Sequence, residues 1–98
     1  MHLTFDPAKN ARNIAERGLS FELVDELDWG TAVVWEDVRF NYGERRLGVL
    51  AFLGLRLHAA VVTYRDEAVH VISFRKANKR EVQRYGEERR RPGIPSRR

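Results

Sequence analysis

Three runs of β-branched and apolar residues, joined by very short links, constrain the fold of this chain more than any other feature. The runs cover residues 46–53, 57–64 and 68–74, and the links are Gly54-Leu55-Arg56 and Arg65-Asp66-Glu67. β-branched and aromatic residues favour a pleated, half-buried strand over a helix. Because the links have the length of hairpin turns, the pattern predicts an antiparallel meander, preceded by one more strand at about 31–36.

The side chains of each predicted strand alternate between two faces. In the strand at 57–64, one face has Leu57, Ala59, Val61 and Thr63, and the other has His58, Ala60, Val62 and Tyr64. The last strand has Val69, Val71 and Ser73 opposite His70, Ile72 and Phe74, so both of its faces are partly apolar. We expect helices against both faces. The longer polar link from Asp37 to Arg45 is a candidate functional loop.

Two helices are predicted before the sheet. Asp6-Pro7 has the residue types that begin a helix, a capping carboxylate followed by proline, and Gly18 ends that helix. Ser20 caps the second helix, and Leu19 is placed to pack on Val24.

One basic helix is predicted after the sheet. Asn78 and Glu81 have the spacing of a capping pair, and the helix runs from there to about Arg90, before Pro92. Together these elements predict an α+β fold: two N-terminal helices packed on a twisted antiparallel sheet of about four strands, with a basic C-terminal helix.

The length of 98 residues fits one domain, which we expect over residues 1–91. Residues 92–98 lack apolar surface and are predicted to form a disordered basic tail. The chain has no cysteine, which excludes disulfides and thiolate metal ligands, and its three histidines lack the spacing of a zinc site. It has no signal peptide and no apolar stretch that could span a membrane, so we expect a cytoplasmic protein without a membrane partner.

Positive charge is concentrated at the C-terminal end. Residues 75–98 contain ten Lys and Arg against three Glu, a net charge of +7, so residues 1–74 carry −3 of the total of +4. Such asymmetry is typical of a surface that binds a polyanion such as RNA. A solvated basic tail with no partner is an equally simple interpretation of the charge alone.

Several local motifs resemble the BrnT family of type II toxins, whose fold is similar to that of the RelE/ParE superfamily. The matching residues extend from about 3 to 86, and the main motifs are Phe5-Asp6-Pro7-Ala8-Lys9-Asn10, Thr63-Tyr64-Arg65, Val71-Ile72-Ser73-Phe74-Arg75-Lys76-Ala77, Arg80-Glu81 and Tyr85. Two features depart from the family pattern: His70 stands where relatives often have arginine, and the segment Arg45-Arg46-Leu47-Gly48 is shorter and more apolar than usual.

The resemblance implies a toxin that cleaves RNA, inhibits translation and is neutralised by an antitoxin. The expected antitoxin is BrnA-like, with a ribbon-helix-helix half, and forms a heterotetramer or larger complex with the toxin. Operator DNA is then contacted only through the antitoxin. The expected reaction uses the RNA's own 2′-hydroxyl, yields a 2′,3′-cyclic phosphate and requires no metal or other cofactor.

Such cleavage needs a base near the 2′-hydroxyl, cations around the phosphorane and an acid at the departing 5′-oxygen. Arginine suits the phosphate because its planar fork donates two hydrogen bonds. We expect Arg65, Arg75 and Arg80 to converge on one edge of the sheet. The predicted catalytic residues are Arg65, Arg80, His70, Tyr64 and Tyr85, and the predicted RNA-binding residues are Arg75, Lys76, Lys79 and Arg84.

Other candidate residues have a simpler structural interpretation. Glu81 is a possible base, but we interpret it as a capping partner of Asn78. We interpret Trp29 and Trp35 as core or partner-contact residues rather than RNA stackers, and we leave His58, Lys9 and Asn13 outside the site.

Two other functions fit the same residues. The first is a toxin of the same superfamily that binds a protein target such as gyrase without catalysis. The second is a simple RNA-binding or DNA-binding module without toxicity.

Overall fold

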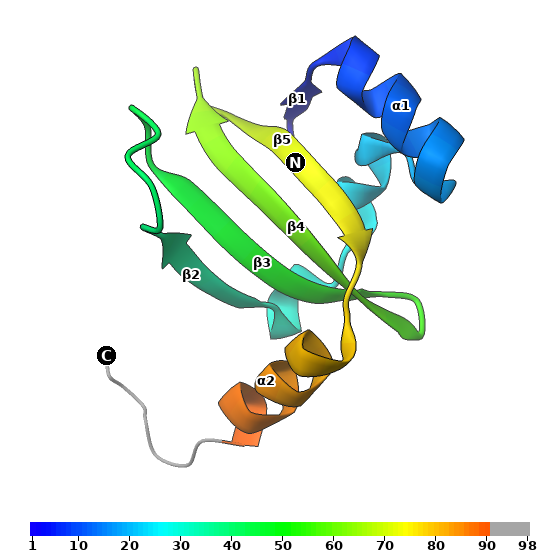
Figure 1. Cartoon of the computed structure of the whole chain (residues 1–98), viewed down its shortest axis with the longest axis vertical. Helices are drawn as coiled ribbons and strands as arrows, with labels where there is room; N and C mark the ends of the chain where they lie inside the picture. The colour runs from blue at the N-terminus through cyan, green and yellow to red at the C-terminus, as the bar shows by residue number, and fades with distance from the viewer. Residues whose placement is uncertain (91–98) are drawn as a thin grey trace.

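A five-stranded mixed sheet forms the centre of the protein, and the computed structural model describes residues 1–90 (Figure 1). The strand order is β1-β5-β4-β3-β2. The strands are β1 Leu3–Phe5, β2 Val33–Asp37, β3 Arg46–Leu53, β4 Arg56–Arg65 and β5 Ala68–Lys76. The α-helices are α1 Pro7–Arg17 and α2 Lys79–Arg90, and two 3₁₀ helices are η1 Phe21–Glu26 and η2 Trp29–Thr31. The predicted α+β class is confirmed, whereas the predicted tail at 92–98 lies outside the described residues.

The predicted meander is confirmed over β3, β4 and β5. β3 pairs antiparallel with β4, and β4 pairs antiparallel with β5. Each turn contains two residues, and Gly54, Asp66 and Glu67 have positive φ angles of 62°, 50° and 64°. Positive φ angles match the twist of two-residue hairpins, which explains why these short links can join paired strands.

The prediction of a purely antiparallel, four-stranded sheet is wrong. A fifth strand, β1, pairs parallel with β5, with Leu3 opposite Val69 and Phe5 opposite Val71. Three residues are too few to show an alternating pattern, so sequence periodicity does not identify this strand.

The second predicted helix is the 3₁₀ helix η1 rather than an α-helix. With six residues it is a short segment, although it is longer than the three or four residues usual for a 3₁₀ helix. The predicted cap is confirmed, because Ser20 Oγ accepts a hydrogen bond of 3.1 Å from the backbone N–H of Glu22. Leu19 and Val24 are both buried in the same apolar cluster.

The two faces of the sheet are covered very differently. One face is covered by η1, whose Phe21 and Val24 pack with Val62, Val71 and Phe74 in the main core. On the opposite face, α2 covers one end only (Figure 1). At that end, Tyr85 packs on a smaller cluster that contains Leu50, Leu57 and Ala59. We call this partly uncovered side the open face; Trp35, Gly48, Val61 and Ser73 lie on it.

A β-bulge in β5 changes which residues reach the open face. Val61 is opposite Ser73 but Val62 is opposite Val71, so Ile72 is an extra residue. The bulge reverses the alternation of side chains along β5. His70 therefore shares the open face with Ser73 and Arg75, whereas strict alternation predicts His70 and Ser73 on opposite faces.

Helix α1 is attached by polar contacts. None of its side chains is buried. Asn10 Oδ1 accepts a hydrogen bond of 2.7 Å from the N–H of Phe21, and Asn13 Nδ2 donates to the carbonyl oxygens of Leu19 and Phe74, both at 3.0 Å. Asn13 thus connects α1 directly to β5.

Replacing Asn13 with alanine is expected to lower the free energy of unfolding by about 1–3 kcal/mol, because two partly buried carbonyl groups lose their donor. Urea unfolding at pH 7 measures this change. The exposed neighbour Arg12 is the control, and Arg12→Ala is expected to change stability by less than about 0.5 kcal/mol. Equal effects of the two substitutions would contradict the role of Asn13.

Candidate functional site: the open face of the sheet

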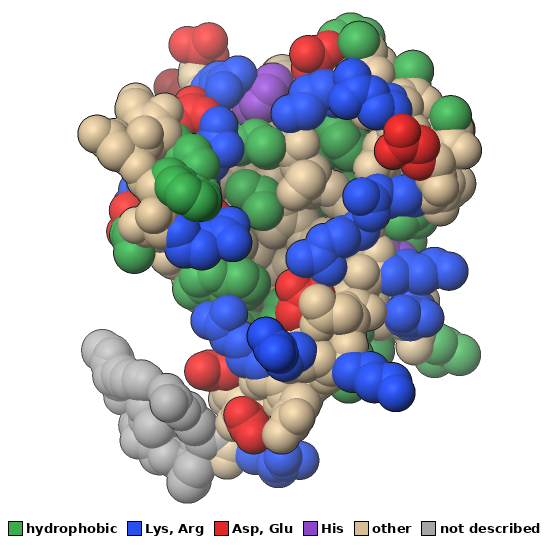
Figure 2. All heavy atoms as spheres, in the orientation of Figure 1, with side chains coloured by type: hydrophobic (Ala, Val, Ile, Leu, Met, Phe, Trp, Pro, Cys, Tyr) green, Lys and Arg blue, Asp and Glu red, His purple; other side chains and the backbone are tan. Residues whose placement is uncertain are grey.

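The open face carries a shallow hollow with cations on both sides. Lys and Arg side chains flank a central region of apolar and backbone atoms (Figure 2). The hollow has a cavity of about 230 Å³, and its lining includes Trp35, Gly48, Val61, Ser73, Arg75 and Arg84. The small side chains along its floor keep the middle of the sheet accessible, so an extended anion can lie across it.

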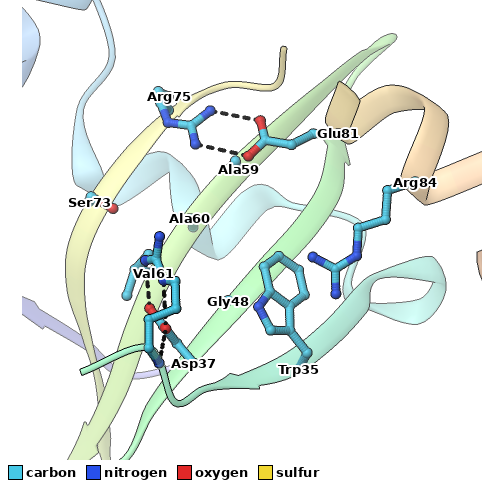
Figure 3. A pocket seen from close by; sticks show the side chains of 11 residues that line it. Trp35, Asp37, Gly48, Ala59, Ala60, Val61, Ser73, Arg75, Glu81 and Arg84 are labelled. Atoms are coloured by element: carbon cyan, nitrogen blue, oxygen red, sulfur yellow. Dashed lines mark hydrogen bonds and ion pairs between the residues drawn. The ribbon is translucent and has the colours of Figure 1, made fainter. Parts of the chain in front are cut away.

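Three arginines around the open face each form a bidentate ion pair with a carboxylate. Arg75 donates to Glu81 at 2.8 and 2.9 Å (Figure 3). Arg39 donates to Asp37 at 2.9 and 2.8 Å, and Arg65 donates to Glu44 at 3.2 and 3.1 Å. A phosphate has the same acceptor geometry as these carboxylates, so each guanidinium is already oriented for an oxyanion.

Asp37 anchors the loop that follows β2. Its side chain is only 5% exposed and accepts hydrogen bonds from Arg39 and from Tyr42 Oη. The hydrogen bonds from Arg39 are the main reason that the pKa of Asp37 lies far below its usual range. These bonds fold the predicted functional loop back, so that it brings Arg39, Tyr42 and Glu44 to the open face.

His70 lies in a cluster of polar and charged groups at the β1 end of the open face. Its Nδ1 is 2.8 Å from Thr4 Oγ1. Partial burial lowers its pKa below 6.5, and the positive charges of Arg65 and Lys9 lower it further, whereas Glu44 opposes them. The imidazole is therefore mainly neutral near pH 7, which is the form that can accept a proton.

Glu44 connects the arginines next to His70. Besides the pair with Arg65, it accepts a hydrogen bond of 3.4 Å from Arg46. The Arg46 guanidinium also lies 4.1 Å from the centre of the Tyr42 ring. Hydrogen bonding to Arg65 is the main cause that lowers the pKa of Glu44, so the carboxylate remains charged and keeps both arginines in position.

The expected convergence of Arg65, Arg75 and Arg80 on one sheet edge is wrong. Arg75 is opposite Ala59, and Arg65 lies six residues further along β4, which separates them by about 20 Å at the strand rise. Both share the open face, but at opposite ends. Arg80 is exposed on α2, at the Arg75 end, and makes no hydrogen bond or ion pair within residues 1–90. The structure brings together Arg65 and His70 instead.

The two predicted catalytic tyrosines lie apart from His70. Tyr64 follows Thr63 on the opposite face of β4 and is 68% exposed. Tyr85 packs edge-on against Phe52 and donates a hydrogen bond of 2.9 Å to the carbonyl oxygen of Thr31. Tyr85 thus has a packing role in attaching α2 to the sheet, and a catalytic role for either tyrosine stays a prediction.

The predicted RNA-binding residues lie at the α2 end of the open face. Lys76 and Lys79 are exposed, and the Arg84 guanidinium lies 4.1 Å from the centre of the Trp35 ring (Figure 3). The capping role of Glu81 is confirmed, because Glu81 and Asn78 exchange hydrogen bonds of 2.8 and 2.9 Å. Glu81 therefore has two partners, Asn78 and Arg75.

His58 belongs to the core. It is 3% exposed, stacks on Phe74 and shares a hydrogen bond with the carbonyl oxygen of Arg56. Within residues 1–90, no group of three or more His, Asp or Glu side chains is arranged to hold a metal ion. Neither α-helix in that range combines the length and apolar character needed to cross a bilayer.

Sequence reasoning missed several residues of this surface. Arg39 and Arg46 carried no motif, and Thr4 lies in the unpredicted strand β1. Lys9, which the sequence analysis left outside the site, is close enough to His70 to lower its pKa. The only available signal for Arg39 was its place in the polar 37–45 link.

A family model for "Ribonuclease toxin, BrnT, of type II toxin-antitoxin system" matches residues 5–81. This chain belongs to the BrnT family. The match contains His70, Arg65, Glu44 and Lys9 of the polar cluster and ends before Arg84. Comparison with curated proteins gives no match to the chain. Membership in a family of ribonuclease toxins implies RNA as the substrate and a cognate antitoxin as the partner.

Replacing Glu81 with glutamine tests the Arg75–Glu81 pair through the pH dependence of stability. The pKa of Glu81 is lowered below 4.5, chiefly by hydrogen bonding to Arg75, so its stabilisation is present above pH 4.5 and is lost as pH falls through the folded-state pKa. Glutamine keeps an acceptor for the Asn78 N–H. At pH 7, Glu81→Gln is expected to cost about 0.5–1 kcal/mol.

Urea unfolding at pH 7 and pH 3 measures the effect, and the difference from the unsubstituted protein is expected to shrink at pH 3. Glu16→Gln, on the exposed surface of α1, is the matched control. A cost for Glu81→Gln that is the same at both pH values would contradict a charge-dependent pair.

Proposed function

We propose that this BrnT-family protein cleaves RNA without a metal ion, by attack of the RNA's own 2′-hydroxyl on the adjacent phosphate. One observation carries the proposal: a mainly neutral histidine, His70, lies beside Arg65 on an open, cation-lined sheet face. The products are a 2′,3′-cyclic phosphate and a free 5′-hydroxyl.

His70 acts as the general base. In the tautomer that we propose, Nδ1–H donates to Thr4 Oγ1, and Nε2 keeps its lone pair for the 2′-hydroxyl proton. Thr4 is a positioning residue, because it fixes the orientation of the ring without contact to the RNA. The resemblance to the family places arginine at this position in many relatives, and in this chain His70 supplies a base there.

Arg65 stabilises the phosphorane. Its guanidinium is held by Glu44, and the attacked phosphate takes over the hydrogen bonds that Glu44 accepts in the free protein. As Nε2 accepts the proton, the 2′-oxygen forms a bond to phosphorus and the bond between phosphorus and O5′ breaks. Water at this open surface donates the proton to O5′. Lys9 adds a second positive charge near the same phosphate.

The flanking RNA follows the remaining cations of the surface. Arg75, Lys76, Lys79, Arg80 and Arg84 lie at the α2 end and bind phosphates on one side of the cleaved bond. Arg39 follows β2 and Arg46 begins β3, and both contact the RNA between the two ends. Cleavage of messenger RNA along this track would inhibit translation.

The antitoxin that we propose has a ribbon-helix-helix half, forms a heterotetramer or larger complex with the toxin and covers the same cationic face. The support is the match to a type II toxin family together with the exposed cations of the open face. Coexpression with the antitoxin is expected to restore growth to cells that this protein inhibits, and purified RNA is expected to compete with the antitoxin for binding.

Replacing His70 with alanine is expected to reduce RNA cleavage by about 10²–10⁴-fold, the usual contribution of a general base. In the unsubstituted protein, the cleavage rate is expected to rise with pH, because only neutral His70 accepts the proton. The midpoint of this rise in the pH–rate profile is expected below pH 6.5, since the pKa of His70 is lowered. Thr4→Val should shift this midpoint. Cleavage of a labelled RNA between pH 5 and 8 gives both results, and His2→Ala is the control. Full activity of His70→Ala would exclude the proposed base.

Arg65→Ala is expected to lower cleavage by about 10²–10³-fold, as for loss of a donor to a developing oxyanion, while Arg12→Ala on α1 leaves the rate unchanged. Cleavage is expected to persist after dialysis against EDTA, and mass spectrometry of the fragments is expected to show a 2′,3′-cyclic phosphate. Loss of activity with EDTA and its recovery with magnesium would overturn the metal-independent mechanism.

A further inference from the structure

We infer that Trp35 is a stacking platform for an unpaired RNA base at a nucleotide next to the cleaved one. This inference rests on the proposed function, since it assigns a substrate contact on the same face. It adds a substrate contact to the sequence-based interpretation of Trp35 as a core or partner-contact residue, since Trp35 is half-buried and packs against the smaller cluster.

Gly48 allows the Trp35 ring to lie flat on the sheet. The two residues are opposite each other on β2 and β3. A Cβ atom at position 48 would lie only 2.2 Å from Trp35 Cζ2, so any other residue would push the indole away. One face of the ring therefore rests on the backbone at Gly48, and the other is directed away from the sheet.

Among residues 1–90, a surface arginine covers that second ring face. Arg84 is exposed on α2, and its guanidinium lies 4.1 Å from the ring centre (Figure 3). A cation over an aromatic ring at an exposed position is held weakly, whereas a base stacked on an aromatic ring is held more strongly. The base replaces the guanidinium, and Arg84 then turns towards the phosphate of the same nucleotide.

The surroundings of Trp35 fit a flat, partly polar ligand. The cavity beside the ring has an apolar floor at Ala59 and Val61, and the exposed hydroxyl of Ser73 and the Arg75–Glu81 pair lie on its far side (Figure 3). A base can stack on the indole over this floor, with its polar edge towards Ser73. Trp29, by contrast, donates its indole N–H to the carbonyl oxygen of Val24 and packs against the main core.

The position of Trp35 relative to His70 identifies which nucleotide it binds. Trp35 lies on β2 and His70 on β5, so they are separated by three strand spacings across the sheet and by two residues in the direction of the strands. This corresponds to about 16 Å between their backbones. One base cannot contact Trp35 while its own 2′-hydroxyl lies at His70. Trp35 therefore binds a flanking base and affects substrate binding rather than the chemical step.

Tryptophan fluorescence tests the inference with an RNA that is not cleaved. The probe is a 2′-O-methyl hexanucleotide, which lacks the attacking hydroxyl. In Trp29→Phe, where Trp35 is the only tryptophan, the hexanucleotide is expected to quench the emission. In Trp35→Phe, the same probe should leave the emission of Trp29 unchanged. A sugar-phosphate hexamer without bases is expected to bind in low salt without quenching Trp35.

Two further variants separate stacking from folding. Trp35→Leu is expected to weaken hexanucleotide binding by about 10-fold, and Trp35→Tyr to recover most of that loss, because tyrosine also stacks. Arg84→Ala uncovers the ring, so uncharged adenosine should quench Trp35 at lower concentration than in the unsubstituted protein. Circular dichroism confirms that each variant is folded.

Equal quenching by the baseless hexamer, or unchanged affinity in Trp35→Leu, would overturn the inference. In either case cleavage of ordinary RNA by the unsubstituted protein would leave the proposed function standing. Absence of both cleavage and hexanucleotide binding would reject the proposed function instead.

Discussion

The extra residue Ile72 in β5 decides which side chains share the open face. Without this bulge, the alternation of the strand would place His70 and Arg75 on opposite sides of the sheet. With it, Val71 and Phe74 both point into the main core, while His70, Ser73 and Arg75 reach the other side. The bulge therefore allows one strand to support a continuous core and a functional surface at the same time.

The carboxylates of the open face keep its arginines ready for a polyanion. Asp37, Glu44 and Glu81 each hold a guanidinium with two hydrogen bonds, in the geometry that a phosphate would use, and Glu44 also accepts a hydrogen bond from Arg46. The Arg65–Glu44 and Arg75–Glu81 pairs are partly exposed, so each adds little stability and can be exchanged, whereas Asp37 is buried and holds the loop in place. RNA phosphates must compete with these carboxylates for the arginines, which lowers RNA affinity. Binding is therefore sensitive to salt and to the loss of a single carboxylate.

Much of the fold follows from local signals in the sequence. The hairpins of β3, β4 and β5, the Ser20 cap and the capping pair of Asn78 with Glu81 were all predicted, because each depends on residues that are close in the chain. The BrnT resemblance was likewise inferred from short motifs, and the family model that matches residues 5–81 confirms it. Strand β1 and the 3₁₀ character of η1 were missed, because segments of three and six residues have too little pattern to identify them.

The candidate site was predicted less well. Arg65 and His70 are brought together across the turn between β4 and β5, but Arg75 lies at the other end of the sheet, and Tyr85 packs on Phe52. The sequence by itself determined the α+β class, the family and the presence of a basic surface, since these depend on local propensity, motif and charge. Only the tertiary structure decided which cations face the same hollow, because strand register, the bulge at Ile72 and the parallel contact of β1 join residues far apart in the chain.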